Sequence, residues 1–364
     1  MPGGDHLIDL GWDERLADGY QELAAVREIG DSAVPGRVVR VDRSACTVAT
    51  EAGEVRAEIA ADVFRADAAG ALGQPAVGDW VVLETGHQGV HGSALISAVL
   101  PRHGVFARQG PDGQTVEQVV AANIDTVFVV SPASSDQRLR RIERYLALAW
   151  QSGATPVVLL TKSDLCPDPA ELLAEVSTVA VGVDVHAVSA VDGSGVEAVR
   201  AYLARGRTVA LVGPSGAGKS TLVNLLAGQE LMSTQDIRSD GKGRHTTTHR
   251  ELIRLPGCGL LIDTPGMRAL APWDVAEGIG LAFHDIEELS EQCSFTDCGH
   301  TGEPGCAVQS AVRSGALSSE RLSNYEKLQR EQKHQELRRD ARAMAEEKQR
   351  IRVRARALKK RPHR

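Results

Sequence analysis

The pattern of apolar and polar positions changes near residue 123, and the change predicts two kinds of domain. Between residues 34 and 100, apolar and polar positions alternate in five short runs that polar turns separate. Short alternating strands of this kind are typical of a small closed β-barrel such as the OB-fold. Such barrels often bind nucleic acid, but a barrel that serves only as a spacer or a protein contact would show the same pattern.

Beyond residue 123, continuous apolar runs alternate with stretches of helical spacing. The apolar runs cover residues 124–130, 156–160, 183–188 and 208–212. This alternation predicts a parallel α/β sheet. Residues 101–122 read as a connector, and Trp12 to Ile29 of the N-terminal extension as one amphipathic helix.

A glycine-rich loop follows the apolar run at 208–212, and a stretch with helical spacing follows the loop. In this setting backbone N–H groups surround phosphate oxygens, Lys219 reaches the β- and γ-phosphates, and the Ser220 hydroxyl ligates Mg²⁺. The alternative, a chance glycine-rich turn, does not account for the flanking strand and helix. We therefore expect a nucleoside triphosphate site built from Gly213, Pro214, Ser215, Gly216, Ala217, Gly218, Lys219, Ser220 and Thr221.

Two further motifs follow the ends of predicted parallel strands, where α/β sheets bind ligands. They are Thr161-Lys162-Ser163-Asp164 and Ser189-Ala190. A carboxylate at Asp164 can accept hydrogen bonds from N1–H and the 2-amino group of guanine, and the Ala190 N–H can serve O6. Alone, the first motif is equally a helix N-cap. Together with the phosphate loop, the pair predicts a guanine-reading site.

Residues 241–250 and 263–266 supply the remaining nucleotide motifs. The first segment is rich in glycine, charge and hydroxyl groups, and we assign its Thr247 to close over Mg²⁺. The second, Asp263-Thr264-Pro265-Gly266, follows an apolar run. Asp263 would hold Mg²⁺, and the Gly266 N–H would sense the γ-phosphate. Each segment alone is also an ordinary surface turn.

A cysteine and histidine cluster near the C-terminus predicts a structural metal site. Three thiolates and one imidazole within fourteen positions suit a closed tetrahedral Zn²⁺ site, which has no open position for catalysis. Reduced core cysteines beside a chance histidine are the alternative. The predicted ligands are Cys293, Cys298, His300 and Cys306, whereas Cys46, Cys166 and Cys258 read as ordinary cysteines.

Charge and composition add a partner and a compartment. The net charge is −7, yet residues 338–364 carry 12 Lys/Arg against 3 Asp/Glu, so this arm has a net charge of +9. Such an arm favours an anionic partner, through electrostatic contact with RNA phosphates, although a solvated tail would look the same. An apolar run of about 18 residues and a basic apolar leader are both missing, so we expect a cytoplasmic protein without a membrane partner.

The order of the five nucleotide motifs is unusual, because the base-reading motifs precede Gly213, whereas in ordinary GTPases they come last. Over residues 34–335 the chain therefore resembles the circularly permuted GTPases of small ribosomal subunit biogenesis in bacteria. The parts expected in chain order are an N-terminal extension (1–33), an OB-fold RNA-binding domain (34–100), a connector (101–122), a circularly permuted α/β P-loop GTPase domain (123–279), a mainly helical zinc-binding domain (280–337) and a basic arm (338–364).

The resemblance implies a Mg²⁺-dependent GTP hydrolase that the ribosome stimulates. Its cofactors would be GTP or GDP, Mg²⁺ and one structural Zn²⁺, and its partners the small ribosomal subunit and the rRNA of that subunit. It would act as a monomer in late maturation of the subunit, with the nucleotide state setting ribosome affinity. The rival hypothesis is a nucleotide-gated RNA-binding module whose hydrolysis is incidental. A nuclease or RNA-modifying enzyme would need a cluster of catalytic carboxylates or an open zinc site.

The sequence departs from ordinary GTPases at two positions. Thr161 stands where asparagine is usual, which weakens the expected contact with the N7 side of the base. Met267 stands where many GTPases have a glutamine that orients water, so intrinsic hydrolysis should be slow. His245, beside the switch threonines, is our candidate for orienting water, as the resemblance also suggests. A solvated loop histidine is the alternative interpretation, and His249 is the second candidate.

Overall fold

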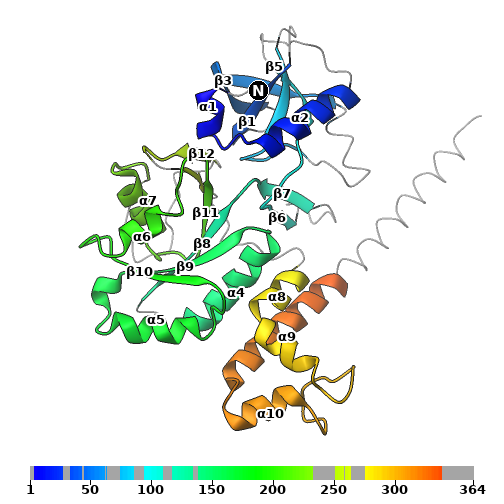
Figure 1. Cartoon of the computed structure of the whole chain (residues 1–364), viewed down its shortest axis with the longest axis vertical. Helices are drawn as coiled ribbons and strands as arrows, with labels where there is room; N and C mark the ends of the chain where they lie inside the picture. Colours follow the sequence, from blue (N-terminus) through cyan, green and yellow to red (C-terminus); the bar gives the residue numbers. More distant parts are fainter. Residues whose placement is uncertain are drawn as a thin grey trace, which may run out of the picture.

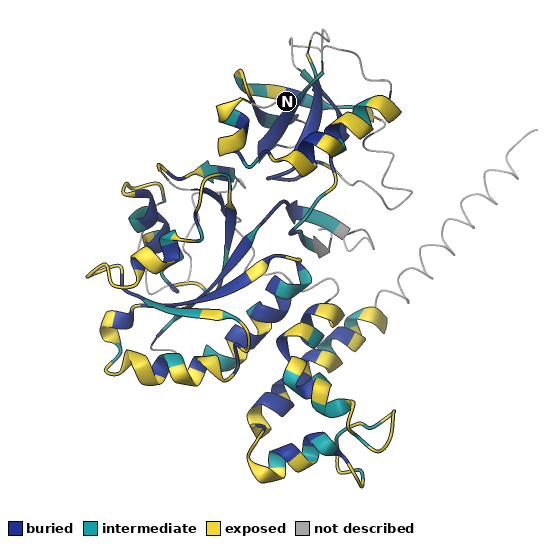
Figure 2. Cartoon of the chain, in the orientation of Figure 1, coloured by how far each residue is buried: buried dark blue, intermediate teal, exposed yellow. Residues whose placement is uncertain are grey.

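The computed structural model divides the chain into a barrel, an α/β domain and a helical domain. Figure 1 shows the α/β domain lying between the other two. In Figure 2 the strands are largely buried, and the helices expose their outer faces. The structure describes residues 4–27, 33–42, 45–61, 63, 74–85, 94–109, 117–133, 138–232, 251–257, 259–263 and 275–337.

Five strands close the N-terminal barrel, which confirms the predicted OB-fold architecture. Their order is β1-β2-β3-β5-β4, and β4 pairs back onto β1. β3 and β5 run parallel, and the other neighbours are antiparallel. Alternate side chains such as Val48, Val81 and Ile96 fill the interior. The strands are β1 (Ala33–Val41), β2 (Ala45–Thr50), β3 (Gly53–Ile59), β4 (Trp80–Glu84) and β5 (Ala94–Val99).

The α/β domain has the predicted parallel sheet, in the order β10-β9-β8-β11-β13-β12. All neighbours are parallel except β12, which runs antiparallel to β13. β12 also pairs with β1 at Glu251 and Arg40, and this contact joins the barrel to the sheet. The strands are β8 (Thr126–Pro132), β9 (Thr155–Thr161), β10 (Asp184–Val188), β11 (Thr208–Val212), β12 (Glu251–Arg254) and β13 (Leu260–Asp263).

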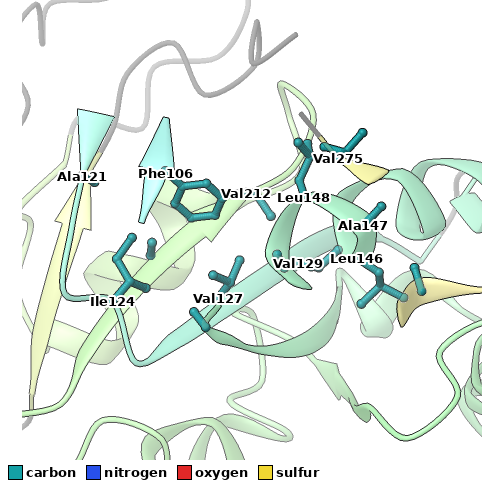
Figure 3. Packing of buried hydrophobic residues seen from close by; sticks show 14 of the residues in the cluster. Phe106, Ala121, Ile124, Val127, Val129, Leu146, Ala147, Leu148, Val212 and Val275 are labelled. Carbon is teal, nitrogen blue, oxygen red and sulfur yellow. The ribbon is translucent and has the colours of Figure 1, made fainter. Parts of the chain in front are cut away.

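Helices cover both faces of this sheet, which explains why its strands are apolar without alternation. Val127 and Val129 face the side that α4 covers with Leu146 (Figure 3). Phe128 and Val130 face the opposite side. The helices are α4 (Arg138–Gln151) and α5 (Pro169–Ser177) on the first face, and α6 (Val196–Arg200) and α7 (Lys219–Ala227) on the second.

The N-terminal extension forms two helices, α1 (Asp5–Asp9) and α2 (Glu14–Val26), where the sequence predicted one. Trp12 between them packs edge-on against Trp80 of the barrel, with ring centroids 4.8 Å apart. Arg37 of β1 is buried, and its guanidinium donates to the carbonyls of Leu10, Gly78 and Asn123. Burial lowers the pKa of Arg37 to about 10, so the side chain stays charged at neutral pH. The extension therefore helps to fix the barrel against the α/β domain.

The predicted connector contains an antiparallel hairpin, β6 (Phe106–Gln109) and β7 (Glu117–Ala121). Phe106 is buried and belongs to the same core as Ile124 and Val127 (Figure 3). The segment is thus partly built into the α/β domain rather than being only a solvated linker.

The helical domain packs against α4. Gly278 lies so close to α4 that an added Cβ would stand 2.0 Å from the Ala147 carbonyl oxygen. Its helices are α8 (Ala276–Ala282), α9 (His284–Ser290), α10 (Ala307–Ser314) and a final helix described over 319–337. Within the described part of the chain, no helix has the length and apolarity that a membrane crossing requires.

Candidate functional site

The predicted nucleotide motifs that the structure describes lie at one edge of the parallel sheet. The phosphate loop follows β11, and the two base-reading loops follow β9 and β10. β13, the neighbour of β11, ends at Asp263. Because these strands are parallel, their carboxyl ends meet at a single edge, which is where α/β sheets bind ligands. The fold therefore brings together motifs that lie up to about a hundred residues apart in the chain.

The phosphate loop needs glycine for both conformation and space. Gly216 and Gly218 have φ angles of 74° and 83°, in the left-handed region that favours glycine. A Cβ on Gly213 would stand 2.1 Å from the Val130 carbonyl oxygen of β8. Helix α7 begins at Lys219, directly after the loop. Its first N–H groups lack helical partners, and this end of the helix attracts anions.

Lys219 folds over the loop that precedes it. Its ammonium group donates to the carbonyls of Gly213 at 2.8 Å and Pro214 at 2.7 Å. Ser220 follows on the first turn of α7 and is half-buried. These positions suit a lysine that contacts phosphate oxygens and a hydroxyl that ligates a cation.

The two base-reading loops contact each other directly. The buried Ser189 hydroxyl donates to the Asp164 carboxylate at 2.8 Å. The same oxygen accepts from the Val191 N–H at 3.1 Å, so the serine is fixed in the turn after β10. Lys162, with a φ angle of 59°, has left-handed backbone, and both Lys162 and Ala190 are exposed. The Asp164 carboxylate is therefore oriented before any base binds.

Thr161 has a contact that sequence reasoning missed. Its buried hydroxyl donates to the Ala217 carbonyl of the phosphate loop at 2.6 Å. The motif pattern assigns Thr161 to the base, but the structure places its side chain against the loop. The only available signal was a hydroxyl at a strand end where asparagine is usual.

The predicted zinc ligands converge, with their donor atoms all within 4.8 Å of one another. Cys293 Sγ and Cys306 Sγ are 3.9 Å apart, and His300 Nδ1 lies 3.7 Å from the first and 3.5 Å from the second. A tetrahedral Zn²⁺ site has sulfur–sulfur edges of about 3.8 Å and sulfur–nitrogen edges of about 3.5 Å, given its usual bond lengths. The three edges among Cys293, His300 and Cys306 match these values, and with Cys298 within 4.8 Å the group could hold a Zn²⁺ ion.

Neighbouring groups hold these ligands in place. The second ring nitrogen of His300 lies 3.0 Å from the Ser290 hydroxyl, which leaves Nδ1 for a metal. Although burial opposes the shift, backbone N–H groups of Val308 and Ala307 lower the pKa of the Cys293 thiol and so favour its thiolate. Hydrogen bonds from backbone N–H groups of the 299–303 loop lower the pKa of Glu303 to about 2.

Several predicted residues lie outside the described residues. These are His245, Thr247, His249, Gly266 and Met267, together with Cys258, the side chain of Asp263 and the basic arm. Of the two ordinary cysteines that are described, Cys46 is buried and Cys166 is half-buried, apart from the zinc-type cluster.

Comparison with known proteins identifies the family. The model of the RsgA GTPase family matches residues 99–273, and the model of 50S ribosome-binding GTPases matches residues 208–339. The chain is 46% identical over 344 residues to small ribosomal subunit biogenesis GTPase RsgA of Streptomyces coelicolor, across 93% of this chain and 90% of that protein. It belongs to the RsgA GTPase family. RsgA 2 of Lactiplantibacillus plantarum is also 46% identical, across 83% of this chain and 84% of that relative.

Two solved structures are similar to this chain. YjeQ from Thermotoga maritima matches with a TM-score of 0.61 and 27% identity, across 82% of this chain and 98% of that one. YloQ, a circularly permuted GTPase, matches with a TM-score of 0.59 and 25% identity, across 84% and 96% of the two chains. Strands β9 and β10, which carry the predicted base-reading motifs, precede the phosphate-loop strand β11 in the chain yet share its sheet. The predicted family resemblance is confirmed, and the chain is a GTPase with a guanine-nucleotide site in circularly permuted order.

Proposed function

We propose that this GTPase binds the small ribosomal subunit and its rRNA, and acts late in maturation of the subunit. It works in the cytoplasm as a monomer, and its nucleotide state sets its affinity for the ribosome. One observation carries the proposal: a guanine-type site at one sheet edge belongs to a chain 46% identical to a small ribosomal subunit biogenesis GTPase over 93% of its length. The domains at either side of the site supply surfaces for the ribosome.

The sequence motifs assign roles within the nucleotide site. Residues 213–221 hold the phosphates, Asp164 accepts from the guanine edge, and Ser189 fixes that carboxylate at 2.8 Å. When bound, Mg²⁺ would neutralise charge on the β- and γ-phosphates, held by Ser220 with Thr247 and Asp263 as further predicted ligands. The chemical step is attack of water on the γ-phosphorus.

Hydrolysis by the isolated chain is slow, because Met267 cannot orient the attacking water. His245 is the proposed substitute, supported by its place beside the switch threonines in the sequence. Contact with the ribosomal subunit would move the His245 side chain to a position where it can orient the attacking water.

Two parts of the chain are proposed to bind RNA. The Cys₃His cluster, with its ligand atoms within 4.8 Å, binds one structural Zn²⁺ and fixes the loop at 293–306. The basic arm at 338–364 adds 12 Lys/Arg that can pair with phosphates. RNA affinity should therefore fall steeply as salt rises.

GTP turnover with and without purified small ribosomal subunits tests the function. We expect slow turnover alone and a saturable increase in kcat with small subunits, but not with large ones. A Lys219→Ala variant controls for GTPases that contaminate the subunits. His245→Ala should lower the stimulated kcat much more than GTP affinity, with His249→Ala as the paired variant.

Two outcomes contradict these proposals. Turnover that is unchanged by small subunits, despite nucleotide-dependent binding to them, would favour the nucleotide-gated RNA-binding module. An unchanged rate in the His245→Ala variant would remove this residue from the mechanism.

A further inference from the structure

Thr161 joins the base-reading loop to the phosphate loop. It is the last residue of β9, and its side chain is buried. Its hydroxyl lies 2.6 Å from the Ala217 carbonyl oxygen, and the Ser131 carbonyl oxygen lies further away at 3.4 Å. A Cβ added to Gly218 would lie 3.6 Å from the same hydroxyl, so Thr161 borders the next residue of the loop as well.

Both ends of this contact are held in place. The Thr161 carbonyl accepts from the Ala133 N–H at 2.8 Å, which fixes the end of β9 against β8. The Ala217 methyl is fully buried in the core that contains Leu222 of α7. A hydroxyl that bonds a carbonyl between two anchored segments defines the position of the loop.

The number of donors decides what else Thr161 can bind. A threonine hydroxyl has one proton, whereas an asparagine amide has two. Since the proton of Thr161 serves Ala217, none remains for guanine N7, which is itself an acceptor. The asparagine of ordinary GTPases can serve a loop carbonyl and N7 together.

We propose that Thr161 is a positioning residue for the phosphate loop and that its side chain does not read N7 of guanine. Base recognition then rests on the opposite edge of the ring, where Asp164 accepts from N1–H and the 2-amino group. The inference rests on the proposed role of this site in binding GTP. It implies that the site also binds guanine nucleotides that lack N7.

The first test compares GTP with 7-deaza-GTP, in which carbon replaces N7, by measuring Kd for the full-length chain. We expect the two values to agree within about twofold, since no hydrogen bond is lost. Thr161→Asn restores a spare donor, so GTP should then bind about tenfold more tightly than 7-deaza-GTP, the equivalent of one ordinary hydrogen bond. Discrimination of tenfold or more by the natural chain, and its loss in Thr161→Val, would overturn the inference.

The second test removes the hydroxyl. Thr161→Val should raise Kd for both nucleotides about tenfold, because the Ala217 carbonyl loses its donor. Thr161→Ser keeps the hydroxyl and should restore affinity. Thr208→Val is the matched control: Thr208 is buried in the same sheet, and its hydroxyl has no hydrogen-bond partner among the described residues.

The outcomes separate the inference from the proposed function. If Thr161→Val binds GTP as well as Thr208→Val does, Thr161 does not position the loop. Melting temperatures without nucleotide detect loss of the fold, and the 7-deaza comparison on the natural chain stands even if Thr161→Val does not fold. If the natural chain binds neither GTP nor GDP, the nucleotide-binding assignment itself fails.

Discussion

At the scale of single residues, the proposed preference for guanine rests on Asp164. Its carboxylate is acceptor-only, and guanine presents N1–H and an amino group as donors on one edge. The Ser189 hydroxyl donates to one carboxylate oxygen of Asp164 at 2.8 Å and so restricts the orientation of the carboxylate. A charged acceptor makes stronger hydrogen bonds than a neutral one, so most of the selectivity should come from this residue.

Asp164→Asn should change the preferred base from guanine to xanthine. The amide keeps a carbonyl that accepts from Ser189 or N1–H, but it replaces the second acceptor with a donor that repels the 2-amino group and suits the O2 of xanthine. Loss of two charge-assisted bonds costs about 3 kcal/mol or more, so Kd for GTP should rise at least about a hundredfold. Competition between GTP and XTP for a fluorescent nucleotide measures the change. Equal weakening of both nucleotides would instead indicate a damaged loop.

The sequence motifs name candidate nucleotide residues because chemistry sets their spacing, and those that the structure describes lie at one sheet edge. Phosphate binding needs the glycines of residues 213–218 in a fixed order, and guanine needs a carboxylate at a strand end. The bond from Thr161 to Ala217 was not predictable, because 55 residues separate the two in the chain. Only the parallel pairing of β9 with β8, and of β8 with β11, brings them together.

At the scale of elements, the loop at 293–306, which carries the four predicted zinc ligands, should need bound Zn²⁺ to keep its structure. The segment at 293–306 has no strand or helix among its described residues. Its cysteine and histidine donor atoms lie within 4.8 Å of one another. Structural zinc sites of this kind contribute folding free energy directly. The loop and the start of α10, which Cys306 caps by accepting from the Gln309 N–H, should therefore order together.

Cys298→Ser should lower zinc content from about one ion per chain to near zero and expose 293–306 to protease, with GTP affinity retained. Metal analysis and limited proteolysis measure both effects, and a strong chelator should reproduce them in the natural chain. Cys166→Ser serves as the control, because this cysteine lies apart from the cluster and should not change zinc content. Full zinc content in Cys298→Ser would contradict the ligand assignment.

The elements themselves show where pattern reading succeeds and fails. Apolar runs without alternation, such as Thr208–Val212, were predicted because burial on both faces leaves a clear signal. The β6–β7 hairpin was missed, since each strand has only four or five residues, and burial of Phe106 follows from tertiary packing. The separate helix α1 was not predicted, because it has only five residues. Gly11 follows it with a φ of 90°, and the Gly206 carbonyl oxygen, 2.5 Å from an added Cβ, leaves no room for a larger residue.

At the scale of the whole molecule, a buried charge network docks the helical domain onto the GTPase domain. Arg321 of the final helix donates to Glu143 of α4 at 2.8 Å and to both carboxylate oxygens of Asp285 in α9. Asn324 also donates to Glu143, and the Arg321 guanidinium lies 4.7 Å from the Phe283 ring centre. Because Arg321 and Glu143 are both nearly inaccessible to water, removing Arg321 leaves the Glu143 carboxylate buried without its positive partner.

Arg321→Ala should weaken this docking by about 3–5 kcal/mol, the usual cost of breaking a buried ion pair. Amide hydrogen exchange in residues 319–337 measures the loss, since one global unfolding transition is not assured in a chain of several domains. Arg330→Ala on the same helix is the control. Its exposed contact with Glu326 spans 3.9 Å and should contribute at most about 0.5 kcal/mol.

Through the same interface, a change at the nucleotide site could alter the helical domain. β13 ends at Asp263 beside the phosphate-loop strand, and α8 begins only thirteen residues later at Ala276. The start of α8 is held on two sides. The Val275 N–H donates to Gln332 of the final helix at 3.2 Å, and the Gly278 N–H donates to Gln151 of α4 at 2.9 Å. We therefore expect exchange in residues 319–337 to differ between the GDP and GTP-analogue states, and the difference to disappear in Arg321→Ala. Identical profiles in the two states of the natural chain would show that the helical domain does not sense the nucleotide.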